Sequence, residues 1–176
     1  MSELRTNRIV PRDGLPSGAS GGIIQCVQTV LTTGVTYSNT SFADIPSPGL
    51  SVSITPSSSS NKILVIADIS CTGASGQYNM FQLVRGSTNI YRGTDSKTYI
   101  GSKIYYPVSD NANEHASQGG IYMSFLDSPA TTSAVTYKVQ VRVTGSTGGI
   151  NRRVSDDDTC VAVSYTHLTL PTICSV

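Results

Sequence analysis

The chain has 176 residues, a formal net charge of +1 and a charged fraction of 13%, well below the ~25% of an ordinary soluble protein. This length supports one domain with a substantial core. The balanced charge speaks against nucleic acid as a partner. No apolar run reaches the ~18 residues of a membrane span, and the N-terminus lacks the apolar stretch of a secretory signal.

Residues 1–22 are predicted to form an N-terminal arm and linker. A short Arg-flanked apolar segment, Leu4–Val10, is followed by a Pro-Arg-Asp-Gly turn and by the small-residue stretch Leu15–Gly22. Because apolar positions are few, we expect this arm to become ordered only against a partner chain.

Residues 23–162 are predicted to form one β domain. In Val135–Val143 every odd position is apolar and every even position is polar, a pattern that a helix cannot use. The same period places Ile63, Val65, Ala67, Ile69 and Cys71 on one face of a strand. Further strands are expected around Leu50–Ile54, Ile121–Phe125, Ile23–Leu31, Asn79–Val84 and Thr98–Tyr106.

Turn residues separate these segments, and no segment carries a helical stripe. They occur at Pro46–Gly49, Pro56–Asn61, Thr72–Gly76, Arg85–Thr88, Asp127–Pro129 and Gly145–Gly149. About eight to ten strands at this spacing predict an all-β fold, an antiparallel β-sandwich of the jelly-roll type.

The end of the chain differs from the rest. Val163–Thr172 reads as the in-frame translation of a transposase-type sequencing-library adapter, GTC TCT TAT ACA CAT CTG ACG CTG CCG ACG. We therefore expect residues 163–176 to be adapter-derived rather than native, and the native sequence to continue differently after about Ala162. The last strand, expected at Thr159–Tyr165, would be part native and part foreign. The alternative is a genuine C-terminal strand that ends at Pro171.

Catalytic, metal-binding and cofactor-binding patterns are not found, and the chain is interpreted as a non-enzyme. His115 lies in a polar loop without a partnered nucleophile. Asp156-Asp157-Asp158 lacks the calcium-binding pattern of an EF-hand, and a solvated turn is favoured. Gly18–Gly22 lacks the Lys-Ser/Thr of a phosphate-binding loop. The cysteines, predicted to be free thiols, fit neither a zinc site nor a redox pair: Cys26, Cys71, Cys160 and Cys174.

A cluster of tyrosines is the remaining candidate site. Aromatic faces beside polar groups can stack on sugar rings or anchor a protein contact. The alternative is that these tyrosines are ordinary strand residues. The candidate receptor-binding residues are Tyr91, Arg92, Tyr99, Lys103, Tyr105 and Tyr106.

Several segments resemble structural proteins of tailed phages, including those assembled from marine and other metagenomic samples. The resemblance is carried by Ser2–Gly14, Gly21–Gln25, Ser51–Pro56, Lys62–Ile69, Leu83–Tyr91 and Ser124–Pro129. It implies a tail-fibre-like or virion-surface protein, commonly a homotrimer, with a C1q/TNF-like jelly roll. It also implies an N-terminal part that joins other virion proteins and a distal sandwich that contacts the host.

Three functions are compared on this basis. The preferred one is a tail-fibre-like adhesin in the virion, assembled in the host cytoplasm, that binds a host surface glycan or protein. The second is a capsid or neck decoration protein. The third is a fibre-associated depolymerase, which needs paired carboxylates in a groove. The aspartates available for such a pair are scattered along the sequence: Asp44, Asp68, Asp95 and Asp127.

Overall fold

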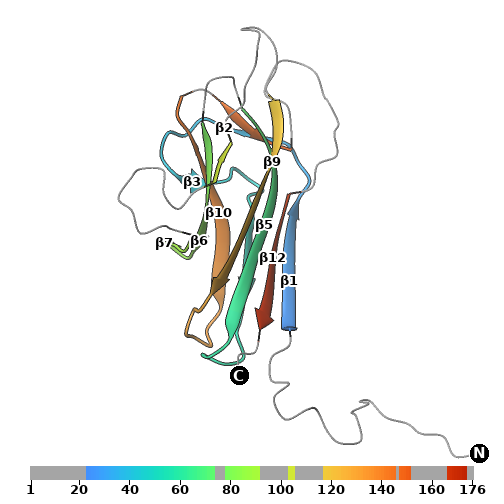
Figure 1. Cartoon of the computed structure of the whole chain (residues 1–176), viewed down its shortest axis with the longest axis vertical. Coiled ribbons are helices and arrows are strands. Elements are labelled where there is room, and N and C mark those ends of the chain that lie inside the picture. The colour runs from blue at the N-terminus through green and yellow to red at the C-terminus, as the bar shows by residue number, and fades with distance from the viewer. Residues whose placement is uncertain are drawn as a thin grey trace, which may run out of the picture.

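The computed structural model describes residues 23–73, 78–91, 103–105, 117–145, 147–151 and 166–173. These residues form twelve β-strands and no helix. The strands make two six-stranded antiparallel sheets that pack face to face as a sandwich (Figure 1). No helix that could cross a membrane occurs in this described part of the chain. The predicted arm, residues 1–22, lies outside it.

The first sheet, called the β5 sheet, is built around its longest strand. One edge of β5 pairs with β9 along its whole length, and the other edge pairs with β12 and then β11. β1 continues the sheet beyond β12, and β2 continues it beyond β11. Its strands are β1 (Ile23–Leu31), β2 (Val35–Tyr37), β5 (Lys62–Gly73), β9 (Ser117–Asp127), β11 (Gly148–Ile150) and β12 (Thr166–Ile173).

The second sheet, called the β10 sheet, has two central strands, β6 and β10, that pair with each other. β3 and β4 both pair with the free edge of β10, one after the other along its length. β7 and β8 share the free edge of β6 in the same way. Its strands are β3 (Ala43–Asp44), β4 (Ser51–Ile54), β6 (Asn79–Arg85), β7 (Thr88–Asn89), β8 (Lys103–Tyr105) and β10 (Val135–Val143).

The core lies between the sheets and is filled by alternate residues of the long strands. The predicted face of β5, from Ile63 to Cys71, is fully buried. It faces Tyr137, Val139 and Val141 of β10 and Phe81 and Leu83 of β6, which belong to the same cluster. Burial of each such aliphatic side chain is worth roughly 1.5–3 kcal/mol, so the period-two pattern largely accounts for the fold.

The predicted strands agree closely with the structure where they are described, although twelve strands are present rather than eight to ten. Of the strand predicted at Thr98–Tyr106, only Lys103–Tyr105 is described. Val135–Val143 and Ile23–Leu31 form strands with the predicted bounds. The predicted turn at Arg85–Thr88 joins β6 to β7, with Gly86 in the left-handed region at φ 57°. The short strands β2 and β3 were not predicted, because two or three residues are too few to display a period.

The predicted turn at Gly145–Gly149 is only partly correct, because Gly148 and Gly149 belong to β11. Gly148 lies against a buried tyrosine ring of the neighbouring strand. A Cβ at this position would lie 2.5 Å from Cζ of Tyr37 and closer still to Oδ1 of Asn79. This glycine therefore permits a close approach within the sandwich and does not form a turn.

β12 occupies a central position between β1 and β5, and it contains a proline. Its pairing with β1 includes Pro171, whereas its pairing with β5 stops at Thr169 and resumes at Thr172. Proline has no amide N–H to donate and is uncommon in central strands. The strand expected at Thr159–Tyr165 falls outside the described residues.

Relative to Pro129→Thr, we expect Pro171→Thr to raise the free energy of unfolding by about 1 kcal/mol, since it supplies the missing ladder donor. Thermal unfolding followed by circular dichroism measures the change. Pro129→Thr, placed outside any strand, controls for the greater freedom that a lost proline gives the unfolded chain. A Pro171→Thr protein no more stable than Pro129→Thr contradicts this account of the ladder.

Candidate functional site

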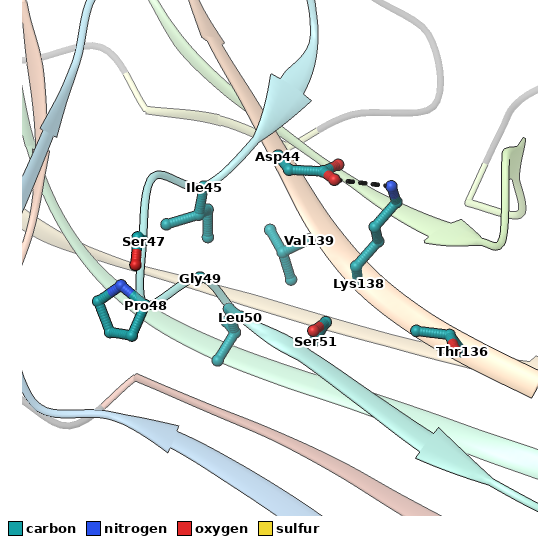
Figure 2. Close-up of a pocket in the computed structure, with 10 residues that line it drawn as sticks. All are labelled: Asp44, Ile45, Ser47, Pro48, Gly49, Leu50, Ser51, Thr136, Lys138 and Val139. Atoms are coloured by element: carbon teal, nitrogen blue, oxygen red, sulfur yellow. Dashed lines mark hydrogen bonds and ion pairs between the residues drawn. The ribbon is translucent and has the colours of Figure 1, made fainter.

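A hollow of about 360 Å³ opens on the outer face of the β10 sheet (Figure 2). It forms where β10 changes partner. β3 pairs with β10 at Gln140 and Val141, and β4 pairs with it from Val135 to Lys138. Residues 45–50 arch between these two short strands, opposite Val139.

The arch is made by the predicted turn at Pro46–Gly49. The amide of Gly49 donates to the carbonyl of Pro46 at 2.9 Å, and Gly49 has a φ of 77°, which favours glycine. The Ser47–Pro48 peptide bond is cis. The amide of Val139 donates to the carbonyl of Leu50 at 3.1 Å and fixes the far end of the arch to β10.

The hollow has a polar rim. Ile45, Leu50 and Val139 lie beneath it, with side chains that are buried in the core between the sheets. The rim carries a carboxylate, an ammonium group, three hydroxyls and one proline ring, and Figure 2 shows them around the opening: Asp44, Lys138, Ser47, Ser51, Thr136 and Pro48.

Asp44 is held at the rim by two donors. Lys138 Nζ donates to its Oδ2 at 2.8 Å, and Gln140 Nε2 donates to its Oδ1 at 2.8 Å. The hydrogen bond from Lys138, followed by that from Gln140, lowers the pKa of the Asp44 carboxyl. The site therefore carries a paired negative and positive charge at neutral pH.

A ladder of amide side chains extends from Asp44 across the β10 sheet. Gln140 accepts from Gln82 Nε2 at 2.7 Å, and Gln82 accepts from Asn89 Nδ2 at 2.7 Å. Asn89 Oδ1 accepts from the backbone amide of Tyr91 at 3.1 Å. The amides all point the same way, so each bond polarises the next toward the carboxylate.

We expect the pKa of the Asp44 carboxyl to lie below the ordinary aspartate range. We expect this pKa to rise in Lys138→Met, which lacks the hydrogen bond from the ammonium group. The contribution of this carboxyl to stability is complete above the ordinary carboxyl pKa. It is lost as the pH falls through the lower folded value. Carboxyl-detected NMR titration measures both midpoints. Identical midpoints in the two proteins contradict the role given to Lys138.

A second polar cluster closes one end of the sandwich. Arg85 Nη1 lies 3.0 Å and 2.8 Å from the two carboxylate oxygens of Asp127, and the Tyr137 hydroxyl donates to Asp127 Oδ2 at 2.5 Å. Asp127 ends β9 of the β5 sheet, whereas Arg85 and Tyr137 belong to the β10 sheet. Burial, and then the hydrogen bond to Asp127, raises the pKa of Tyr137.

This cluster is a clamp between the two sheets. Asp127 is only 6% exposed, and both of its oxygens are already hydrogen-bonded to the other two members. Cys71 lies in the core and is also inaccessible to solvent. Its burial raises the pKa of the thiol to about 12. Cys26 is exposed on β1, and both of these cysteines are free. Cys160 and Cys174 lie outside the described residues.

The predicted receptor-binding residues are only partly described. The Tyr91 ring packs edge-on against Phe125, with ring centroids 6.4 Å apart, so it covers the margin of the core. Lys103 and Tyr105 lie on β8, where their backbones pair with Phe81 and Asn79. Arg92, Tyr99 and Tyr106 fall outside the described residues, so the receptor-site assignment remains a prediction.

The other sequence candidates also lie outside the described residues: His115, Asp156–Asp158 and Gly18–Gly22. In the described part, no group of three or more His, Cys, Asp or Glu side chains is placed to hold a metal ion. Asp44 and Asp127 are each engaged by their own cationic partner.

No protein-family model matches the chain, and no curated protein matches its sequence. The hollow itself was missed by the sequence analysis. Its only signal was the Pro-Ser-Pro-Gly turn, which showed that the chain bends but not that both flanking strands share β10.

Proposed function

We propose that this chain is a non-enzymatic virion protein of a tailed phage, a tail-fibre-like adhesin that contacts a host surface glycan or protein. In this proposal the sandwich is a C1q/TNF-like jelly roll that assembles as a homotrimer. The N-terminal arm joins it to other virion proteins. The observation that carries the proposal is the set of exposed apolar side chains on the outer face of the β5 sheet.

Strand order supports the jelly roll. The chain passes from β5 in the first sheet to β6 in the second, returns to β9, crosses again to β10, and returns to β11 and β12. The first strand, β1, pairs with the last, β12. Greek-key connections that bring distant strands side by side in this way are the hallmark of jelly rolls.

The outer face of the β5 sheet supports the oligomer. Ile24, Tyr122 and Leu126 are 52%, 57% and 47% exposed on its two outer strands. Leu64 lies directly opposite Leu126 in the sheet and adds to the same face. The same face also carries the exposed charges of Lys62 and Asp68, and Asp68 lies opposite Tyr122. Exposed apolar residues rimmed by polar ones on one face of a small domain are typical of a protein interface. A closed ring of identical subunits would cover this face in every copy.

The outer face of the β10 sheet is polar along β10, whereas along the neighbouring β6 it holds two buried apolar side chains, Met80 and Val84. It carries the amide ladder, the Asp44–Lys138 pair and the hydrogen bond between Ser53 and Thr136, 2.7 Å long. Arg142 lies over the Phe42 ring at 5.3 Å. In the proposed trimer this face points outward, where an adhesin meets its receptor.

Immunogold labelling of virions tests the adhesin against the decoration alternative. Label at the tail tip supports the adhesin, and label over the head supports a decoration protein. Purified protein that binds no host cell envelope contradicts the adhesin. Cleavage of a host polysaccharide by the purified protein contradicts its non-enzymatic nature and supports the depolymerase instead.

We also propose that residues 163–172 are adapter-derived. Pro171 at a central position of the β5 sheet, with the ladder to β5 interrupted beside it, supports this proposal, since a strand selected for that position is expected to donate along its whole length. The nucleotide sequence of the coding region tests it. Codons that differ from the adapter in this stretch contradict it.

A further inference from the structure

We propose that the hollow between β3, β4 and β10 binds a single neutral sugar residue of a surface glycan. This inference rests on the proposed adhesin function and gives it a location and a ligand class. Three observations carry it: spare hydrogen-bonding capacity at the rim, charge balance, and size.

The rim groups are held in place but not saturated. Lys138 Nζ has three N–H donors and uses one on Asp44, and each Asp44 oxygen accepts one bond and can accept another. The Ser47 and Ser51 hydroxyls are exposed and form no hydrogen bond within the described part of the chain. Fixed donors and acceptors with free positions are what a binding site needs.

The spacing of the charged pair matches adjacent hydroxyls of a sugar. Lys138 Nζ and Asp44 Oδ2 are 2.8 Å apart, so one hydroxyl can donate to the carboxylate while its neighbour accepts from the ammonium group. Gln140 and the amide ladder behind it keep the carboxylate in this orientation. The pair needs no rearrangement before it meets a ligand.

Charge balance selects a neutral ligand. The carboxylate and the ammonium group cancel each other, so neither an anionic nor a cationic group gains a net attraction at this rim. The exposed Pro48 ring at the rim offers surface to the C–H groups of a sugar ring. A volume of 360 Å³ lies at the small end of ligand sites, which favours one ring rather than an extended chain.

The hollow also stays accessible in the proposed assembly. It opens on the outer face of the β10 sheet, whereas the exposed apolar side chains lie on the opposite face of the sandwich, that of the β5 sheet. A trimer that covers the apolar face therefore leaves the hollow open to solvent.

The test is a titration of the purified full chain with a panel of neutral methyl hexosides and methyl N-acetylhexosaminides, followed by NMR. We expect chemical-shift changes at Asp44–Ser51 and Thr136–Val139. We expect affinity for the best sugar to fall at least tenfold in Lys138→Met and in Asp44→Asn. Lys62→Met removes the same charge from an exposed residue at the start of β5 and should leave affinity unchanged.

The outcomes separate this inference from the proposed function. If the panel does not bind while the protein still binds host envelopes, the sugar site is wrong and the adhesin stands. If sugars bind but the shifts lie elsewhere, or both rim variants bind as wild type does, the site is also wrong. If neither sugars nor envelopes are bound, both proposals fail. Melting temperatures of Lys138→Met and Asp44→Asn near that of wild type show that a loss of sugar affinity is local to the hollow.

Discussion

Gly148→Ala is expected to lower the free energy of unfolding by about 3 kcal/mol, because it inserts a methyl group where no space exists. The added Cβ would lie 2.5 Å from Tyr37 Cζ and even closer to Asn79 Oδ1. Tyr37 donates its hydroxyl to that same Asn79 oxygen at 3.1 Å, and both side chains are buried. Relief of the clash therefore has to break a buried hydrogen bond or shift β11 away from β2.

Gly120→Ala is the matched control for this substitution. Gly120 also lies in a strand of the β5 sheet, β9, but a Cβ there has no atom within 4 Å. We expect this variant to be as stable as wild type or slightly more stable, since alanine reduces the freedom of the unfolded chain. Urea unfolding of the two variants gives both values. Equal stabilities of Gly148→Ala and Gly120→Ala would show that β11 does not pack as described.

Asp127→Asn is expected to cost about 2–4 kcal/mol, because it removes the charge from the buried centre of the clamp. The asparagine side chain would retain one acceptor oxygen for two donors, Arg85 and the Tyr137 hydroxyl. The two sheets are joined at this end by those bonds, so their loss weakens the contact between the sheets directly. Chemical denaturation measures the change.

Asp44→Asn is the control for Asp127→Asn, because it removes the carboxylate from an ion pair that is exposed instead of buried. The Asp44 side chain is 58% exposed, and exposed pairs contribute about 0–1 kcal/mol. A double-mutant cycle between Asp127→Asn and Tyr137→Phe should give a coupling energy above about 0.5 kcal/mol. Additive effects of the two substitutions, or a cost for Asp127→Asn no larger than that for Asp44→Asn, contradict the clamp.

The long strands could be predicted because their pattern is local. Val135–Val143 and the buried face from Ile63 to Cys71 follow from the alternation of residue types alone, and the structure confirms them. Low charge and abundant small polar residues further narrowed the fold class. Burial of alternate residues is the dominant energetic term in such strands, so little else was needed to place them.

The clamp at Asp127, the close packing of Gly148 and the hollow depend on contacts between residues that are distant in the sequence. Asp127 was predicted as a turn residue, and its burial against Arg85 follows only from the way β9 meets β6. Gly148 also looked like a turn residue until its packing against Tyr37 was known. The hollow exists because β3 and β4 divide one edge of β10, which no local pattern reports.

The most direct test of the proposed adhesin is its oligomeric state, measured by light scattering coupled to size-exclusion chromatography. The account predicts the mass of three chains, where one chain is 18.6 kDa. It also predicts dissociation when a charge is placed on the outer face of the β5 sheet by Leu126→Lys, opposite Leu64. A wild-type protein that elutes as a folded 18.6 kDa monomer, with that face open to water, contradicts it.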